Sequence, residues 1–227
     1  MPGHNTAIPQ WAVERVIRRR GAEHVFTDIE PTRTALIVID MQNAFMLPGV
    51  AFVEIKTAPE IVPNINRLAR PMRAAGGTVV WIVTTYTDEV SVDWSTYYRL
   101  STTENGARRS HALVKGTEGH QLWDSLEVLP DDPMIEKTRF SALVQGSSDL
   151  DAYLRAHGID TLIITGCLTD VCCESTARDG MMLNYKVIMV TDANAADTDA
   201  DHNAAMTAFY STFGDIMPTD MLVDRLT

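Results

Sequence analysis

Three residue types that together can perform nucleophilic catalysis occur at the ends of separate apolar segments. Cys172 supplies a sulfur nucleophile, Asp40 a carboxylate and Lys137 an ammonium group. A neutral thiol is a weak nucleophile, so Asp40 is needed to take the thiol proton and later return it to a leaving amine. Lys137 can keep that carboxylate charged and favour the thiolate. The set predicts acyl transfer through a thioester that water then hydrolyses.

The segment around Cys172 has the pattern of a buried strand followed at once by a helix. Residues 161–165 are apolar and β-branched, as is typical of a parallel strand, and Gly166 is expected to break it. Thr169 or Asp170 can cap a helix that places Cys172 in its first turn. Free N–H groups and the positive end of the helix dipole there favour a thiolate, and backbone N–H groups near Thr169 and Cys172 can bind an oxyanion.

The rest of the chain alternates short apolar runs with helical patterns. We expect helices over 11–20, 58–75, 149–157, from residue 169 to about 185, and 199–213, and strands over 34–39, 78–83, 134–137, 161–165, 186–190 and 215–217. This alternation predicts a three-layer α/β/α, doubly wound, mainly parallel six-stranded sheet with strand order 3-2-1-4-5-6. In that order the first and fourth strands are neighbours, so Asp40 and Cys172 should flank one crevice, with Lys137 close by.

Composition indicates one sizeable globular domain. Of the 227 residues, 45% are hydrophobic, and we place an N-terminal arm with a peripheral helix at 1–30 and a single domain at 31–227. The first ten residues are polar and are expected to pack loosely. The basic cluster at Arg15 and Arg18–Arg20 suits a solvated face or a subunit contact.

Charge and cysteine content limit the partners and the compartment. The net charge of −11 argues against nucleic acid as a partner, and no run of residues is apolar enough to cross a membrane. The three cysteines include an adjacent pair, which rarely forms a disulfide, so a reducing cytoplasm is the simplest location.

The adjacent cysteines must be assigned different roles. Helical spacing puts Cys173 on one stripe with Ala177 and Met181, which we interpret as the packed face, while Cys172 lies on another stripe. We therefore assign Cys172 to chemistry, Cys173 to packing and Cys167 to the turn.

Other residues are candidates for holding a substrate. The weakly patterned segment 86–129 is typical of a lid or a subunit contact. Gln42 and Asn43 can orient Asp40 or simply form a turn, and His202 suits a helix cap. Arg99 or Arg139 can pair with a substrate carboxylate. Four aromatic residues can line a pocket, although core packing or an interface suits the first two better: Trp94, Tyr97, Phe45 and Phe140.

Three motifs in the expected order resemble the isochorismatase-like cysteine hydrolases: Ala35–Phe45, Glu136–Ser141 and Thr165–Asp179. The resemblance extends over nearly the whole chain from residue 30 onward. It implies the triad Asp40, Lys137 and Cys172, with no metal or organic cofactor. It also implies a cis peptide at Leu168–Thr169 that aims backbone N–H groups at the substrate carbonyl oxygen, and a homo-oligomer, dimer or tetramer.

Within that family the motifs are most similar to amidohydrolases of the ureidoacrylate, N-carbamoylsarcosine and biuret kind. The resemblance implies cleavage of a C–N bond in a small linear ureide, carbamoyl compound or amide, releasing ammonia or carbamate.

Two alternatives remain open. One is a nicotinamidase-like, metal-assisted deamidase, although residues 40–60 lack the Asp-x-His motif of those enzymes and the six histidines show no metal-ligand spacing. The other is a non-catalytic thiol module for redox sensing or binding that uses Cys172 and Cys173.

Overall fold

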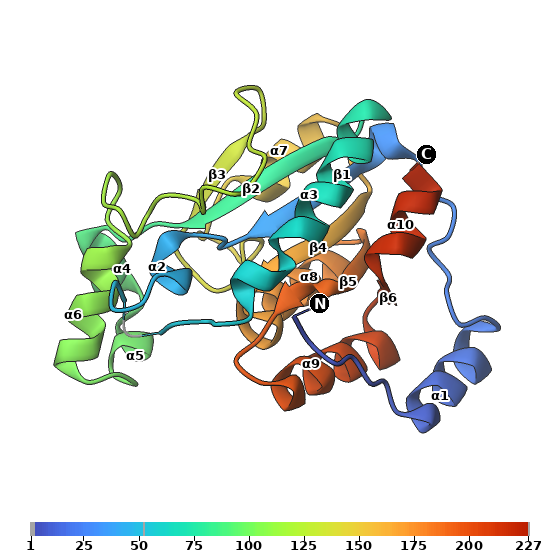
Figure 1. Cartoon of the computed structure of the whole chain (residues 1–227), viewed down its shortest axis with the longest axis horizontal. Helices are drawn as coiled ribbons and strands as arrows, with labels where there is room; N and C mark the ends of the chain where they lie inside the picture. Colours follow the sequence, from blue (N-terminus) through green and yellow to red (C-terminus); the bar gives the residue numbers. More distant parts are fainter. Residues whose placement is uncertain (1–2, 52, 227) are drawn as a thin grey trace.

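The computed structural model describes residues 3–51 and 53–226 and centres on one six-stranded sheet (Figure 1). Every neighbouring pair of strands is parallel, and the order is β3-β2-β1-β4-β5-β6. This confirms the predicted fold class and strand order. The strands are β1 Thr34–Ile39, β2 Thr78–Thr84, β3 Met134–Lys137, β4 Thr161–Cys167, β5 Lys186–Ala195 and β6 Asp215–Met217.

Helices cover both faces of the sheet (Figure 1). On one face lie α3 and α10, and on the other lie α7, α8 and α9, with α1 against α9. None of the helices in the described residues is long and apolar enough to cross a membrane. The helices are α1 Gln10–Arg20, α2 Asn43–Met46, α3 Ala58–Ala74, α4 Asp88–Asp93, α5 Ser95–Tyr98, α6 Thr103–Ala112, α7 Leu150–Ala156, α8 Glu174–Met182, α9 Asp199–Thr212 and α10 Thr219–Leu226, with a 3-10 turn at Pro31–Arg33 and a π-helical turn at Thr169–Cys173.

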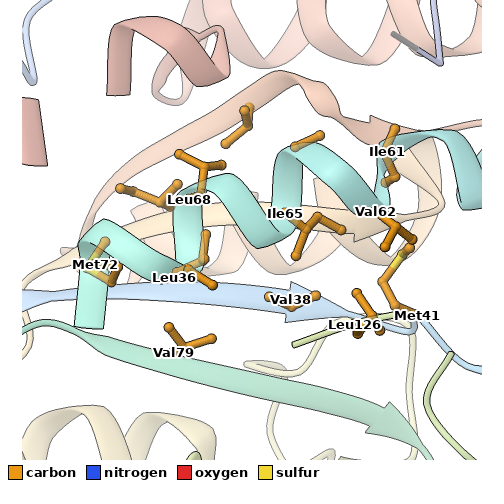
Figure 2. Packing of buried hydrophobic residues seen from close by; sticks show 14 of the residues in the cluster. Leu36, Val38, Met41, Ile61, Val62, Ile65, Leu68, Met72, Val79 and Leu126 are labelled. Carbon is orange, nitrogen blue, oxygen red and sulfur yellow. The ribbon is translucent and has the colours of Figure 1, made fainter. Parts of the chain in front are cut away.

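Strand β1 is buried on both faces, which explains its continuous apolar sequence. Leu36 and Val38 point toward α3, where they pack against Ile65 and Leu68 (Figure 2). The alternate residues of the strand, such as Ile37, belong to the core on the opposite face. The alternation follows from the two-residue period of a strand and fixes β1 at the centre of the molecule.

Gly166 does not end β4 as the sequence suggested, because the strand continues to Cys167. Gly166 has φ 116°, and a Cβ there would lie 2.0 Å from the carbonyl oxygen of Ile39. The glycine therefore lets β4 continue in close contact with the end of β1. Strand β5 is also longer than predicted, and the β4–β5 register shifts between Ile164 and Gly166.

Two other elements differ from the expectation. Helix α8 ends at Met182 rather than near residue 185, since Asn184 adopts the left-handed conformation at φ 72° and turns the chain into β5. Helix α10 was not predicted at all, although it packs on α3 and covers part of the sheet.

The expectation of a loosely packed N-terminus is wrong for the described residues 3–10. His4 is buried, its Nε2 accepts a hydrogen bond from the backbone N–H of Ala196, and its Nδ1 donates to the Asp199 carboxylate. Nor is the basic cluster only a solvated face. Arg19 and Arg20 of α1 donate to backbone carbonyls at the end of α9, which offers unpaired acceptors and negative dipole charge.

The segment 86–129 contains the three short helices α4, α5 and α6, which lie beyond the carboxyl ends of β1 and β2 (Figure 1). Isolated bridges join Tyr86 to Val114 and Gln42 to Leu122. The first bridge closes the segment on itself, and the second joins it to the chain that follows β1, at the edge of the sheet where the predicted site residues lie.

Candidate active site

Four neighbouring strands each bring one reactive or polar side chain to the same edge of the sheet. Asp40 follows β1, Thr84 ends β2, Lys137 ends β3, and Cys172 lies in the π-helical turn after β4. The Nζ atom of Lys137 lies 2.8 Å from Asp40 Oδ2 and 3.6 Å from Cys172 Sγ. The three residues predicted from the sequence therefore meet in one buried group.

Asp40 ends β1 in a conformation that few residues adopt. Its φ is 54°, which an aspartate tolerates better than most side chains. Its backbone N–H still donates to Ile82 of β2, so the ladder is kept while the chain turns. The carboxylate is fully buried and accepts a hydrogen bond of 2.8 Å from the Thr84 hydroxyl. The backbone turn thus aims the carboxylate along the sheet edge toward Lys137.

Lys137 is fully buried and uses its ammonium group on several acceptors. It donates to Thr84 Oγ1 at 2.7 Å and to the Arg139 carbonyl at 3.1 Å, besides its ion pair with Asp40. Burial alone lowers the pKa of Lys137, but the negative charge of Asp40 and the nearby Cys172 sulfur outweigh it, and the pKa is raised. The site therefore holds a charged ammonium group.

Cys172 is a neutral thiol at rest, because burial outweighs the Lys137 charge, which favours the thiolate as the sequence suggested. Burial raises the pKa of Cys172 to about 12. The Lys137 charge acts in the opposite direction, while the Asp40 carboxylate disfavours the thiolate by its charge and by accepting a hydrogen bond from the thiol. A reaction of this thiol at neutral pH would need a base to take its proton, and the Asp40 carboxylate lies close enough for its charge to act on the thiol.

The cis peptide lies at Cys167–Leu168, one residue before the predicted Leu168–Thr169 position. The position differs because β4 extends to Cys167. The chain therefore turns directly after the strand, and Thr169 already begins the π-helical turn. Neither Thr169 nor Asp170 caps this helix through its side chain: the N-cap residue is Leu168, and no side chain caps the turn.

The Thr169 hydroxyl instead lies 3.0 Å from Nδ1 of His202. His202 is fully buried, stacks on His4 with ring centroids 4.4 Å apart, and lies 3.3 Å from the Thr6 hydroxyl. Burial lowers the pKa of His202 to about 4. His202 therefore connects the N-terminal arm and α9 to the turn that carries Cys172, a role beyond that of a cap.

The other two cysteines lie in the core. Cys173 is fully buried, and its thiol points toward the Thr165 carbonyl at 3.9 Å. Cys167 lies 3.1 Å from the backbone oxygen of Asp40. The structure thus separates the adjacent cysteines, with only Cys172 within 4 Å of the Lys137 ammonium group.

Three of the predicted pocket aromatics form a cluster. Trp94 and Tyr97 stack with centroids 4.3 Å apart, and Phe140 packs edge-on against both. The Arg139 guanidinium lies 5.4 Å from the Trp94 ring centroid and donates to the Thr138 carbonyl and hydroxyl. A cavity of about 530 Å³ borders Trp94, Arg139 and Phe140 beside α8, and no member of the triad lines that cavity.

Two predicted substrate-binding residues have other surroundings. Gln42 is fully buried and accepts a hydrogen bond from the Thr84 backbone N–H at 2.8 Å, while its amide donates to the carbonyls of Thr84 and His120. Its amide is therefore occupied in positioning Thr84. Phe45 packs against core clusters around Ile55 and Leu113 rather than with the other aromatics.

Asn43 and Arg99 also lie apart from the triad's hydrogen bonds. The Asn43 amide donates to the Glu118 carbonyl, as expected for a residue that stabilises a turn. Arg99 is exposed.

Sequence reasoning missed two polar residues beside the triad. Thr84 bridges Asp40 and Lys137, and the predicted strand order contained a signal for it, because β2 must lie between β1 and β3. Arg109 of α6 carries a charge that acts on both Cys172 and Asp40. Its position depends on the fold of the segment 86–129, which has no readable pattern.

Within the described ranges, no three histidine, cysteine, aspartate or glutamate side chains lie together as a metal ion would require. The metal-assisted alternative thus finds no ligand set in residues 3–51 and 53–226.

Comparison with known proteins agrees with the fold and with the motifs. The Isochorismatase domain matches residues 34–221. This chain belongs to the isochorismatase family. It is similar to a cysteine hydrolase from Pseudomonas syringae pv. phaseolicola 1448A, with 30% identity over 88% of this chain and 94% of that one and a TM-score of 0.79.

Two further solved structures are similar. An isochorismatase family protein from Desulfovibrio vulgaris is 30% identical over 85% of this chain and 97% of that one, with a TM-score of 0.73. N-carbamoylsarcosine amidase from Thermoplasma acidophilum is 26% identical over 83% of this chain and 97% of that one, with a TM-score of 0.65. Membership of this family identifies the chain as a hydrolase.

Proposed function

We propose that this chain is a cysteine amidohydrolase that cleaves a C–N bond of a small linear ureide, carbamoyl compound or amide. The observation that carries the proposal is the contact of one buried ammonium group, that of Lys137, with both the Asp40 carboxylate and the Cys172 sulfur. The similarity to a protein named N-carbamoylsarcosine amidase supports the same bond type.

The first half of the reaction forms a thioester. Cys172 Sγ attacks the carbonyl carbon of the substrate while its proton moves to Asp40, and the carbonyl oxygen becomes an oxyanion. The candidate donors to that oxyanion are the backbone N–H groups of Thr169 and Cys172. In the same turn, the backbone N–H groups of Val171 and Cys173 donate to the Leu168 carbonyl. When the C–N bond breaks, the leaving nitrogen takes the proton from Asp40 and departs as ammonia or an amine.

The second half regenerates the thiol. Asp40 takes a proton from a water molecule that attacks the thioester carbonyl, the C–S bond breaks, and the proton returns to sulfur. The Lys137 ammonium group pairs with the Asp40 carboxylate at 2.8 Å and holds it in place to act as the base in both halves. No step requires a cofactor.

The test compares Cys172→Ala with Cys173→Ala, which deletes the same atom from the adjacent buried position. Ammonia release is measured over ureides, N-carbamoyl amino acids, maleamate and nicotinamide. We expect both variants to keep the circular dichroism of the parent protein, and only Cys172→Ala to lose turnover. Full activity in Cys172→Ala, or loss of turnover in both variants, would contradict the thioester route through Cys172.

Mass spectrometry distinguishes catalysis from a redox or binding module. Iodoacetamide should label Cys172, and an amide that is hydrolysed should slow the labelling. Labelling followed by reversible oxidation, without ammonia release from any compound in the panel, would favour the thiol module instead.

A further inference from the structure

The start of the turn that carries Cys172 is held from outside the turn by His202 of α9. Thr169 begins that turn and is fully buried, and no side chain caps the turn. Helix α9 packs against it, and the Thr169 hydroxyl lies 3.0 Å from Nδ1 of His202. The other end of the turn is held by α8, where the Thr176 hydroxyl donates to the Cys172 carbonyl at 2.7 Å. Side chains of two different helices thus fix the two ends.

The hydrogen bonds of His202 determine which ring nitrogen carries the proton. The Thr6 hydroxyl donates to the Thr191 carbonyl at 3.1 Å, so its single hydrogen is already used. Nε2 of His202 lies 3.3 Å from the same hydroxyl oxygen and must therefore be the donor in that contact. Burial lowers the pKa of His202 to about 4, so the ring is neutral at pH 7 and has only one N–H. Nδ1 is then an acceptor, and the Thr169 hydroxyl donates to it.

The N-terminal arm holds the His202 ring in this orientation. His4 stacks on the ring, with centroids 4.4 Å apart and an angle of 20° between the planes. The His4 ring is itself fixed on both sides, because its Nε2 accepts from the backbone N–H of Ala196 at 2.9 Å and its Nδ1 donates to the Asp199 carboxylate at 2.8 Å. A chain of printed contacts therefore runs from the arm through one buried histidine to the turn of the nucleophile.

We propose that His202 is a positioning residue for the nucleophile. By accepting the Thr169 hydroxyl, it holds the first residue of the turn and thereby the direction of the Cys172 sulfur. The N-terminal arm sets the place and the proton of the ring through His4 and Thr6. This role rests on the proposed function, because it takes Cys172 as the nucleophile. His202 acts through Thr169, so its loss should lower kcat more than it changes KM.

Hydrogen exchange measured by mass spectrometry tests the positioning without any substrate. The backbone N–H groups of Val171 and Cys173 donate to the Leu168 carbonyl, so their exchange reports opening of the turn. Thr169→Val keeps the shape of the side chain and removes the hydroxyl. In that variant, exchange within 168–174 should become about fivefold to tenfold faster, the effect of one lost hydrogen bond. Thr169→Ser keeps the hydroxyl and should keep the exchange rates of the parent protein.

A second buried threonine provides the matched control. Thr34 is fully buried at the start of β1, and its hydroxyl donates to the Glu30 carbonyl at 2.7 Å. Thr34→Val removes one hydrogen bond far from the turn, so it should leave exchange within 168–174 unchanged. Equal acceleration by Thr34→Val and Thr169→Val would show that the Thr169 hydroxyl only adds to global stability, and would overturn the proposal. Unchanged exchange in Thr169→Val would overturn it as well.

Variants of His202 separate its two hydrogen bonds. His202→Asn places an amide oxygen near the position of Nδ1, so it can still accept from Thr169 while losing the contact with Thr6. His202→Leu can make neither bond. Exchange within 168–174 should be fast in His202→Leu and closer to that of the parent protein in His202→Asn. The double variant His202→Leu/Thr169→Val should open the turn no more than either single variant, since both remove the same hydrogen bond. If His202→Leu does not fold, Thr169→Val still decides the outcome.

Nitrogen NMR of the histidine rings tests the assignment of the proton. The signals of His202, identified by their loss in His202→Asn, should show a neutral ring protonated at Nε2 at pH 7. A proton on Nδ1 would overturn the proposal, because Nδ1 could not then accept from Thr169.

Turnover distinguishes this role from the proposed function. With a compound that the parent protein hydrolyses, Thr169→Val should lower kcat about tenfold or more and leave KM within about twofold, whereas Thr34→Val should change neither. If no compound in the panel releases ammonia, the proposed function fails, while fast exchange of the turn in Thr169→Val would still support the positioning. Hydrolysis with the same kcat in Thr169→Val and the parent protein would refute the role of His202 and leave the proposed function standing.

Discussion

Breaking the buried ion pair between Lys137 and Asp40 should destabilise the fold by several kcal/mol. Both side chains are only 1% exposed, and their charged atoms are 2.8 Å apart. At an effective dielectric constant of about 20, two unit charges at that distance attract by about 6 kcal/mol, most of which offsets the cost of removing both from water. Lys137→Met keeps the length of the side chain and removes its charge, so it leaves the Asp40 carboxylate buried and uncompensated.

Removing one member of a buried ion pair destabilises a protein by about 3–5 kcal/mol. The free energy of unfolding, measured by urea denaturation at pH 7, should fall by that amount in Lys137→Met. The double variant Asp40→Asn/Lys137→Met has no charge at either position, so it should recover most of the lost free energy of unfolding. The interaction free energy obtained from the double-mutant cycle should then exceed about 2 kcal/mol. The single variants Asp40→Asn and Lys137→Met and the double variant should all lack turnover.

A surface lysine provides the matched control. Lys186 is 49% exposed and lies 4.0 Å from Asp160, so Lys186→Met should change the stability by less than about 1 kcal/mol. A Lys137→Met protein as stable as Lys186→Met, or single-variant losses that simply add in the double variant, would refute the reasoning. If Lys137→Met proves too unstable to purify, the double variant must still fold.

Three other predictions follow from single residues. Thr84→Val removes the hydroxyl between Asp40 and Lys137 and should lower kcat more than tenfold, whereas Thr85→Val should not. Equal kcat values for the two variants would contradict this. Gly166→Ala should abolish soluble expression because its Cβ would meet the backbone of β1, whereas Gly106→Ala in α6 should express normally. His202 stays neutral in the fold, so lowering the pH from 7 to 5 should cost about 2 kcal/mol of stability by urea denaturation, a loss that should be absent in His202→Gln.

The sign of the His202 effect follows from its two pKa values. The pKa is about 4 in the fold and has its ordinary value of 6.5 in the unfolded chain. Between those values only the unfolded chain binds the proton, so stability decreases as the pH falls. A pH dependence that is unchanged in His202→Gln would show that other groups cause it.

The fold and the meeting of Asp40, Lys137 and Cys172 could be predicted because both depend on regular elements. Continuous apolar runs predicted buried parallel strands, and parallel strands end at one edge, so residues that directly follow those strands had to lie near one another. The exact ends of the strands could not be predicted in the same way. Gly166 usually interrupts a strand, but here the neighbouring strand approaches too closely for a Cβ, a tertiary contact that no local pattern records.

Thr84 and Arg109 show two different reasons for missing a residue. Thr84 was within reach of the sequence, because β2 lies between β1 and β3 and its last residue must fall between Asp40 and Lys137. Arg109 was not, since α4, α5 and α6 are short helices whose positions are fixed by tertiary contacts such as the bridge between Tyr86 and Val114. The short helices at the sheet edge are thus the least predictable part of the chain, while the proposed chemistry depends on the most predictable part, the ends of the strands.

The proposed function explains how a thiol with a raised pKa can react at this site. Burial raises the pKa of Cys172 to about 12, so the thiolate is unfavourable before the reaction begins. Transfer of the thiol proton to Asp40 avoids this difficulty, because one negative charge then moves from the carboxylate to the oxyanion and the net charge of the buried site stays constant. Lys137 lies 2.8 Å from the carboxylate and 3.6 Å from the sulfur, so it can stabilise negative charge on either group during the transfer. In the proposed reaction the nucleophile is therefore generated during the attack, and Asp40 should be as necessary for turnover as Cys172.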